Sequence, residues 1–199
     1  DRENPAGPTA YAIGHVYLGG YETISDAIGF TYQQGSHIFY VLTFPTADHT
    51  WVYDLSTQLW HERAWMDQNG ALHRHRANCV AFAYGKTICG DWQNGKLYNW
   101  DLHVYTDDGA PIIKLRSFPH LVSSLDRISY KQFMADIEVG TDLDPADDPM
   151  LSLRWSDNRG VSFGNVVQQS LGQTGEYKTI PSWNRLGFAR DRVFELSWT

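Results

Sequence analysis

The feature that most constrains this chain is an almost complete lack of helical periodicity. Short runs rich in β-branched and aromatic residues alternate instead with turn dipeptides, a pattern typical of antiparallel strands. Residues 37–44 are apolar on both faces, which predicts a central strand covered on two sides. Asn94-Gly95 predicts a hairpin, because a type I′ turn needs positive φ at both central positions. The chain is therefore predicted to be all-β.

The expected strands fall into three groups that recur about every 45–60 residues, close to the period of propeller blades. We expect residues 1–20 to form an extended N-terminal segment, residues 21–125 two blade-like sheets, and residues 126–199 a third sheet. A closed propeller needs at least four blades. We therefore expect antiparallel four-stranded sheets arranged as a partial β-propeller, with β-sandwich packing of the last sheet as the alternative. The strands are expected at 37–44, 51–54 and 59–63, then 77–84, 86–92, 96–100 and 112–117, then 130–139, 150–155, 162–168, 177–183 and 192–198.

Composition and charge exclude several classes of protein. The chain is 42% hydrophobic and 20% charged, which excludes wholesale disorder. Its apolar runs are far shorter than the roughly 20 residues of a membrane-spanning helix, so no membrane partner is expected. The 16 basic and 23 acidic residues give a formal charge of −7. This balance argues against a protein that coats nucleic acid by neutralising phosphates.

The two cysteines and the start of the chain bear on where the protein is made. Cys79 and Cys89 lie in neighbouring expected strands, where a disulfide is geometrically feasible, but two buried thiols in a reducing cytosol are favoured. The chain opens at Asp1 with neither an initiating methionine nor a signal peptide. We therefore expect it to be the later part of a longer polypeptide.

Tyr53, Asp54, Thr57 and Trp60 form the pattern Y-D-x-x-T-x-x-W, which resembles the inner-to-outer hairpin of kelch-type propeller blades. Asp54 and Thr57 are expected to bond the turn's backbone, and Trp60 to fold onto the blade behind. The residues Gly95 to Asp101 repeat the aromatic-Asp theme in the second group.

A second turn motif resembles the Asp box of sialidases and other propeller glycosidases. We expect it to be a folding device, with polar side chains tying the turn, Gly160 at positive φ and the aromatic residue packed beneath. Glycoside hydrolysis needs two convergent carboxylates or a tyrosine nucleophile, and the sequence supports neither. The motif consists of Ser156, Asn158, Gly160, Ser162 and Phe163.

Four aspartates close together raise the question of a cation site. Calcium takes six to eight oxygen ligands, but the spacing lacks the glycine and the final glutamate of an EF-hand, and prolines close the loop. A solvated turn is favoured over a calcium site. The residues are Asp142, Asp144, Asp147 and Asp148.

His73 and His75 alternate with Arg74 and Arg76, with His61 nearby, and suggest zinc or phosphate binding. Zinc needs further ligands and the arginines repel a cation, so a polar strand start is favoured over a metal site. A phosphate contact is only weakly indicated. There is also no Gly-rich phosphate loop, nucleophile elbow or Cys-His pairing, so we expect neither an enzyme nor a bound cofactor.

An ordered series of segments from about residue 21 to residue 199 resembles the C-terminal half of the packaged-DNA stabilisation proteins of short-tailed bacteriophages. These are tail-accessory, or head-completion, factors. The segments that carry the resemblance are 21–27, 37–45, 51–54, 60–63, 153–157, 183–187 and 190–196.

The resemblance implies a non-enzymatic virion protein, assembled in the host cytoplasm as a homo-oligomeric ring beneath the portal. It further implies that the protein closes the DNA channel, contacts the portal and tail needle proteins, and lies near packaged DNA without sequence-specific binding. Net negative walls would let DNA slide, whereas basic walls would grip its phosphates. The alternatives left open are an Asp-box propeller glycosidase or carbohydrate-binding protein, and an intracellular kelch-like adaptor.

Overall fold

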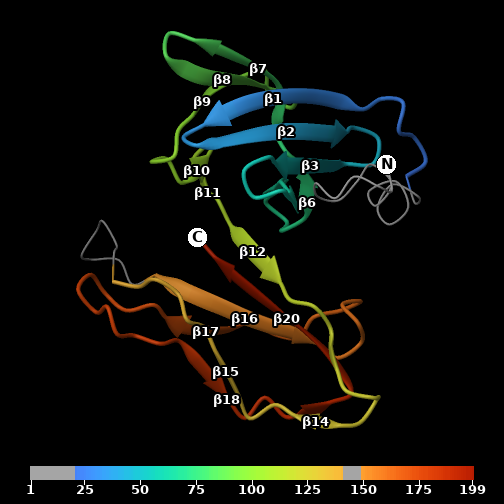
Figure 1. Cartoon of the computed structure of the whole chain (residues 1–199), viewed down its shortest axis with the longest axis vertical. Helices are drawn as coiled ribbons and strands as arrows, with labels where there is room; N and C mark the ends of the chain where they lie inside the picture. The colour runs from blue at the N-terminus through green and yellow to red at the C-terminus, as the bar shows by residue number, and fades with distance from the viewer. Residues whose placement is uncertain (1–20, 141–148) are drawn as a thin grey trace. The chain divides into compact units, whose positions relative to one another are not determined.

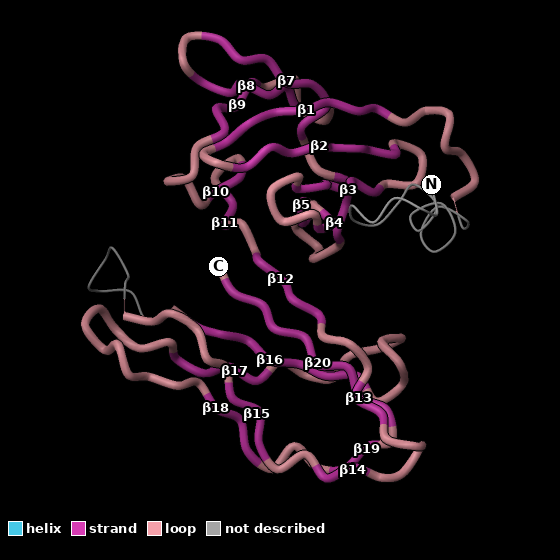
Figure 2. The backbone as a smooth tube through the Cα atoms, in the orientation of Figure 1, coloured by secondary structure: helices cyan, strands magenta, loops and turns pink. Residues whose placement is uncertain are grey.

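The structure is a computed structural model that describes residues 21–140 and 149–199 (Figure 1). Within these residues the elements are β-strands, and no helix is present that could cross a membrane (Figure 2). The chain divides into two compact units, Asp1–Asp107 and Asp108–Thr199. The prediction of an all-β fold of antiparallel sheets is confirmed.

The first unit contains a four-stranded meander in which neighbouring strands follow one another along the chain, as in a propeller blade. Residues 37–44 occupy a central position in it, as predicted. The strand is not covered on both sides, however, because Ile38 and Tyr40 are 43% and 36% exposed. Val41, Thr50 and Val52 are at most 1% exposed, so the middle of the sheet forms the unit's core. The strands are β1 (Ile28–Gln34), β2 (His37–Phe44), β3 (His49–Asp54) and β4 (Leu59–Glu62).

A three-stranded meander, formed by β7 (Ala77–Ala83), β8 (Lys86–Asp91) and β9 (Leu97–Trp100), packs against this sheet. The ring centroids of Tyr32 from β1 and Trp100 from β9 lie 4.2 Å apart. Val80 of β7 joins the same hydrophobic cluster. Two blade-like sheets therefore lie face to face in this unit.

Two short hairpins complete the strands up to the boundary between the units. One joins β5 (Ala64–Met66) to β6 (Leu72–Arg74). The other joins β10 (Thr106–Asp107) to β11 (Ala110–Pro111), and the boundary falls within its turn.

The second unit is built on a sheet whose strand order is β12-β20-β16-β17, with β13 also paired to β20. The C-terminal strand lies inside this sheet, and five consecutive residues of it are buried. The sheet's strands are β12 (Lys114–Ser117), β13 (Leu121–Val122), β16 (Met150–Ser156), β17 (Val167–Ser170) and β20 (Asp191–Trp198).

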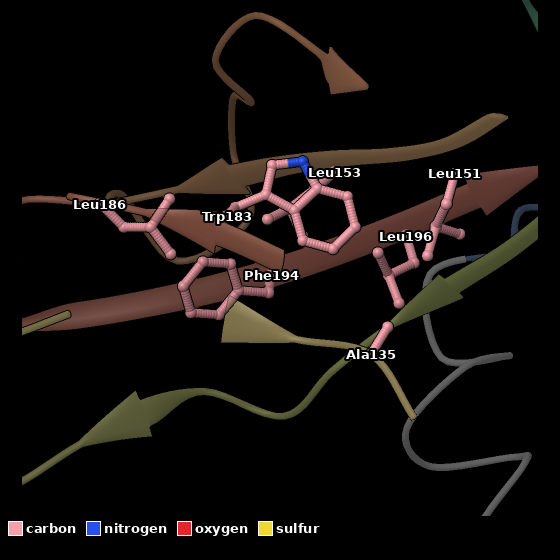
Figure 3. Close-up of a cluster of buried hydrophobic side chains, with 7 residues drawn as sticks. All are labelled: Ala135, Leu151, Leu153, Trp183, Leu186, Phe194 and Leu196. Atoms are coloured by element: carbon pink, nitrogen blue, oxygen red, sulfur yellow. The ribbon is translucent and has the colours of Figure 1, made fainter. Parts of the chain in front are cut away.

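Two short ladders supply the other side of this unit's core. Trp183 lies beside Leu153 and Phe194 of the sheet (Figure 3), so the hydrophobic core joins the sheet to the β15–β18 ladder. This packing is sandwich-like, as the alternative for the last sheet proposed. The ladders pair β14 (Ile128–Ser129) with β19 (Phe188–Ala189) and β15 (Gln132–Met134) with β18 (Ser182–Asn184).

The structure differs from the expected boundaries in several places. The strands expected at 130–139 and 177–183 are only Gln132–Met134 and Ser182–Asn184. Residues 112–117 were assigned to the second blade, but β12 pairs with β20 in the second unit, and the division falls at Asp107 instead of residue 125. This pairing joins distant parts of the chain, so local periodicity does not reveal it. The strand expected at 162–168 begins only at Val167, because the preceding residues form turns and irregular connections.

Candidate functional site: carboxylate-anchored turns and an exposed hairpin

The turn after β3 is organised by the carboxylate of Asp54, which is only 6% exposed. Its oxygens accept hydrogen bonds from the Ser56 amide at 2.9 Å and the Thr57 hydroxyl at 3.0 Å, as the motif predicts. His37 Nδ1 lies 2.8 Å from the same carboxylate. Although burial opposes it, hydrogen bonding from Ser56, His37 and Thr57 keeps the pKa of Asp54 below its usual value. The carboxylate therefore anchors the β3–β4 turn to the start of β2.

Trp60 was expected to fold onto the blade behind, and in the structure it has aromatic neighbours on its own sheet. It pairs across the strands with Tyr53, and the two ring centroids lie 5.1 Å apart. Its ring also meets the edge of Tyr40, with centroids 6.5 Å apart. All three residues share one face of the β1–β4 sheet, because side chains that are paired across a ladder point to the same side.

Asp91 is the structural counterpart of Asp54, and the sequence analysis missed it. Asp91 ends β8 as Asp54 ends β3, and its carboxylate accepts the Gln93 amide at 2.6 Å. Arg76 Nη1 lies 3.2 Å from the other carboxylate oxygen. The signal in the sequence was an aspartate at the end of a strand followed by a large apolar residue, Leu55 or Trp92.

Arg63 is packed among aromatic rings where the two sheets of the first unit meet. Its guanidinium carbon lies 5.0 Å from the Phe39 ring centroid and 5.8 Å from that of Trp100. Its Nη1 donates to the Tyr32 hydroxyl at 2.5 Å. Cation–π attraction and this hydrogen bond stabilise the positive charge of Arg63, which apolar side chains alone would not do.

The cluster at residues 73–76 is engaged inside the first unit. His73 Nδ1 lies 2.7 Å from Asp48, and this hydrogen bond raises the pKa of His73. Arg76 pairs with Asp91, and Arg74 stacks 4.1 Å from the centre of the Trp92 ring. Carboxylates and rings thus cover most of the groups that a phosphate would need, and Arg74 Nη1 is buried without a hydrogen-bond partner among the described residues.

The histidines of this region are not gathered into a metal site. His75 Nδ1 accepts the Ala77 amide at 3.1 Å, and His61 Nε2 accepts from Arg63 at 3.3 Å. Across the described residues, no three His, Cys, Asp or Glu side chains are grouped so that they could hold a metal ion. The four aspartates proposed as an acidic loop, Asp142, Asp144, Asp147 and Asp148, lie outside the described residues.

The Asp-box-like turn is tied together by its own side chains. Asn158 Oδ1 accepts from the Ser156 hydroxyl at 2.7 Å and from the Ser162 amide at 2.9 Å. Its Nδ2 donates to the Ser162 hydroxyl at 2.8 Å, and Ser156 Oγ accepts the Gly160 amide at 2.9 Å. Gly160 has φ +82°, and Arg159 before it also has a positive φ of +63°. The polar groups of the turn therefore bond one another.

Phe163, which was expected to pack beneath the turn, is half-buried and lies outside the hydrophobic cluster of this unit. Its ring lies under the guanidinium of Arg154, with 4.7 Å between the guanidinium carbon and the ring centre. Arg154 also pairs with Glu195, its cross-strand neighbour. The aromatic residue thus packs against the half-exposed arginine of an ion pair whose carboxylate is buried.

Asp157 of the same turn holds a buried arginine that the sequence analysis did not single out. The side chain of Arg192 is only 2% exposed, and its Nε and Nη2 donate to the two carboxylate oxygens of Asp157 at 2.6 and 2.8 Å. Its Nη1 donates to the Leu186 carbonyl at 2.6 Å. The Tyr130 ring centre lies 4.5 Å from the guanidinium carbon. The turn is thereby fastened to β20.

The β7–β8 hairpin presents aromatic side chains to solvent at its tip. Phe82 is 78% exposed and Tyr84 is 96% exposed. Tyr84 and Gly85 form the two-residue turn, with φ of +54° and +71°. Asn, Asp and Gly suit such positions, whereas an aromatic residue is strained there. Backbone strain clusters at functional sites, so the hairpin tip is a candidate contact surface.

The two cysteines lie on opposite faces of the β7–β8 pair. Cys79 is opposite Gly90 in the ladder, and Val80 is opposite Cys89. Both thiols are free, so the open disulfide alternative is not realised. The prediction that both thiols are buried is wrong. Cys79 is exposed, whereas Cys89 is buried and only 4% exposed. Burial raises the pKa of the Cys89 thiol to about 11.

A hollow of about 360 Å³ is lined by described residues near the start of β3. Glu22 supplies a single carboxylate there, beside His49 and the polar and small side chains of the pocket wall. Glycosidases canonically use a pair of carboxylates. The lining residues are Tyr21, Glu22, Thr46, Ala47 and His49.

Comparison with known proteins gives one family. A family model described as bacteriophage P22 Gp10, beta-propeller, matches residues 16–105. The match ends close to Asp107, where the first unit ends. No curated protein matches the chain. The match agrees with the blade-like meanders of this unit. Over residues 16–105, the chain is similar to the phage DNA-stabilisation, or tail-accessory, family that this model describes.

Proposed function

We propose that this protein is a non-enzymatic component of the phage neck, where it closes the portal channel and links the portal to the tail needle. The observation that carries the proposal is the family match over the blade-containing unit. The protein would act in the virion after assembly in the host cytoplasm. Its portal and needle contacts would be made by a homo-oligomeric ring.

Charge supports a position beside DNA without tight binding to it. The formal charge is −7, and Arg74 and Arg76 are engaged by a ring and by carboxylates within the first unit. Phosphate binding requires accessible lysine or arginine side chains. It is strong because these side chains displace the counterions condensed on the DNA. A channel wall of this composition would not grip the phosphates of passing DNA. The packaged DNA would be retained because the protein blocks the exit.

The β7–β8 hairpin is the contact that we assign to the neighbouring copy in the ring. Phe82 and Tyr84 offer aromatic surface at the hairpin tip, and the side chains of protein interfaces are enriched in such residues. Lys86 is the nearest charge in the turn, so the contact would be apolar rather than ionic. The association should therefore depend weakly on salt.

Tyr84→Asn and Phe82→Ser are expected to weaken association of the full-length protein about tenfold or more. Asparagine suits the positive φ at position 84, so the first variant should fold at least as stably as wild type. Sedimentation velocity over a range of protein concentrations and two salt concentrations measures the effect.

Val161→Ser is the matched control, because Val161 is 83% exposed in the second unit. It should associate as wild type does. Unchanged association of both hairpin variants, or a steep loss of wild-type association between low and physiological salt, would show that the interface lies elsewhere.

A further inference from the structure

The chain contains two Asn-Gly pairs, Asn69-Gly70 and Asn94-Gly95, and the structure describes both. Both asparagines are exposed in hairpin turns, one between β5 and β6 and the other between β8 and β9. Asparagine is among the chemically labile residues, and a following glycine leaves its side-chain carbonyl carbon open to attack. The two pairs share this sequence but differ in their hydrogen bonds.

We propose that Asn94 is a site of spontaneous deamidation in the folded protein and that it reacts faster than Asn69. In the first step the Gly95 backbone nitrogen loses its proton to water or hydroxide and bonds to Cγ of Asn94. The bond from Cγ to Nδ2 breaks, and ammonia leaves. Water then opens the resulting succinimide and yields either aspartate or isoaspartate.

The contacts of Asn94 favour this step. The Lys96 amide donates to Asn94 Oδ1 at 2.9 Å, where negative charge develops as the bond forms. Asn94 Nδ2 lies 3.0 Å from the Tyr98 hydroxyl. This hydroxyl can return a proton to the nitrogen as it departs. The Gly95 amide makes no hydrogen bond with any described residue. Its proton can therefore be removed without first breaking a hydrogen bond.

The contacts of Asn69 oppose the same step. The Gly70 amide, which would be the nucleophile, donates to the Asp67 carbonyl at 3.1 Å. Asn69 Nδ2 donates to the Asp67 carboxylate at 3.2 Å. A carboxylate beside the reacting group repels the negative charge that develops on the side-chain oxygen. Asn69 is thus protected by its bonded nucleophile. An aspartate lies near each asparagine, but only Asp67 bonds the side-chain amide of its asparagine, whereas Asp91 accepts the backbone amide of Asn94.

Reaction at Asn94 would alter the second blade-like sheet. The turn is closed by a hydrogen bond from the Asp91 amide to the Lys96 carbonyl at 3.0 Å, and Asp91 also anchors it. Aspartate at position 94 would add a negative charge close to the Asp91 carboxylate. Isoaspartate would insert an extra carbon into the backbone of the turn, which disturbs the register of β9.

The test is to hold the full-length protein at mildly alkaline pH and to measure both sites by peptide mass mapping. Conversion of Asn94 is expected to be at least about threefold faster than that of Asn69 in the folded protein. In denaturant the two rates should converge. Equal rates in the folded protein, or faster conversion of Asn69, would overturn the proposal.

The Tyr98→Phe variant distinguishes the effect of the Tyr98 hydroxyl from the effect of the solvent exposure of Asn94. This variant keeps the ring and should slow conversion at Asn94 while leaving Asn69 unchanged as an internal control. An unchanged rate at Asn94 would refute the role of the Tyr98 hydroxyl. These outcomes do not depend on the proposed place of the protein in the virion.

Discussion

Replacing Asp157 with alanine is expected to lower the free energy of unfolding of the second unit by about 3–5 kcal/mol. The reason is its partner, because Arg192 is only 2% exposed and both of its bonds to Asp157 would be lost. The Leu186 carbonyl and the Tyr130 ring would remain as contacts, but neither neutralises the charge. A buried, uncompensated guanidinium is among the most destabilising features that a single substitution creates.

Arg192→Met should be less destabilising than Asp157→Ala. The Asp157 side chain is 46% exposed and can be hydrated once its partner is gone. Methionine also fills much of the volume of the arginine stem among the same aromatic rings. The double variant should therefore be more stable than Asp157→Ala alone.

Urea unfolding of the two single variants and the double variant measures this asymmetry. Tryptophan fluorescence can follow the second unit, because Trp155 and Trp183 lie in or against its core. Equal losses for the two single variants, or additive losses in the double variant, would contradict the account of Arg192 as a charge that depends on Asp157.

Lowering the pH from 6.5 to 4 is expected to destabilise the first unit by up to about 3 kcal/mol through His75 alone. Burial, assisted by the charges of Arg63 and Arg76 against the opposing effect of Asp91, lowers the pKa of His75 to about 4. The unfolded chain binds this proton near pH 6.5, whereas the folded chain binds it only near pH 4. Stability is therefore complete above pH 6.5 and falls as the pH drops through this range.

His75→Gln is the matched control, since glutamine offers an oxygen to the Ala77 amide that His75 now accepts. Other histidines also make the stability depend on pH, and their effects have opposite signs. Burial lowers the pKa of His61, and the hydrogen bond to Asp48 raises that of His73. The informative quantity is thus the difference between wild type and variant. Free energies of unfolding measured at stepwise pH should converge as the pH falls, and parallel curves would contradict the prediction.

Local patterns in the sequence were sufficient to predict several strands and several turns. Alternating and apolar runs located β2 and β3, Asn94-Gly95 located the β8–β9 turn, and Gly160 has the expected positive φ. Each of these features depends on neighbouring residues alone. Short-range steric rules and side-chain periodicity therefore suffice for them.

Long-range pairing set the limit of what could be predicted. Nothing near residue 114 shows that β12 would pair with β20, so the boundary was expected too late in the chain. The opposite orientation of Cys79 and Cys89 depends on register, since a shift of one residue reverses the faces.

Buried polar groups were the other omission. Arg192 and Asp91 look like ordinary surface residues in the sequence, and only their tertiary partners, Asp157 and Arg76, explain their burial. The sequence likewise did not indicate Tyr84 as a contact residue, because its exposure is a property of the folded hairpin.

The most direct test of the proposed role is the DNA content of parent phage particles assembled with and without the full-length protein. Particles that lack it are expected to package DNA and then lose it, to carry no tail needle, and to recover both properties when the purified protein is added. Particles that lack the protein yet retain their DNA and their needle would contradict the account.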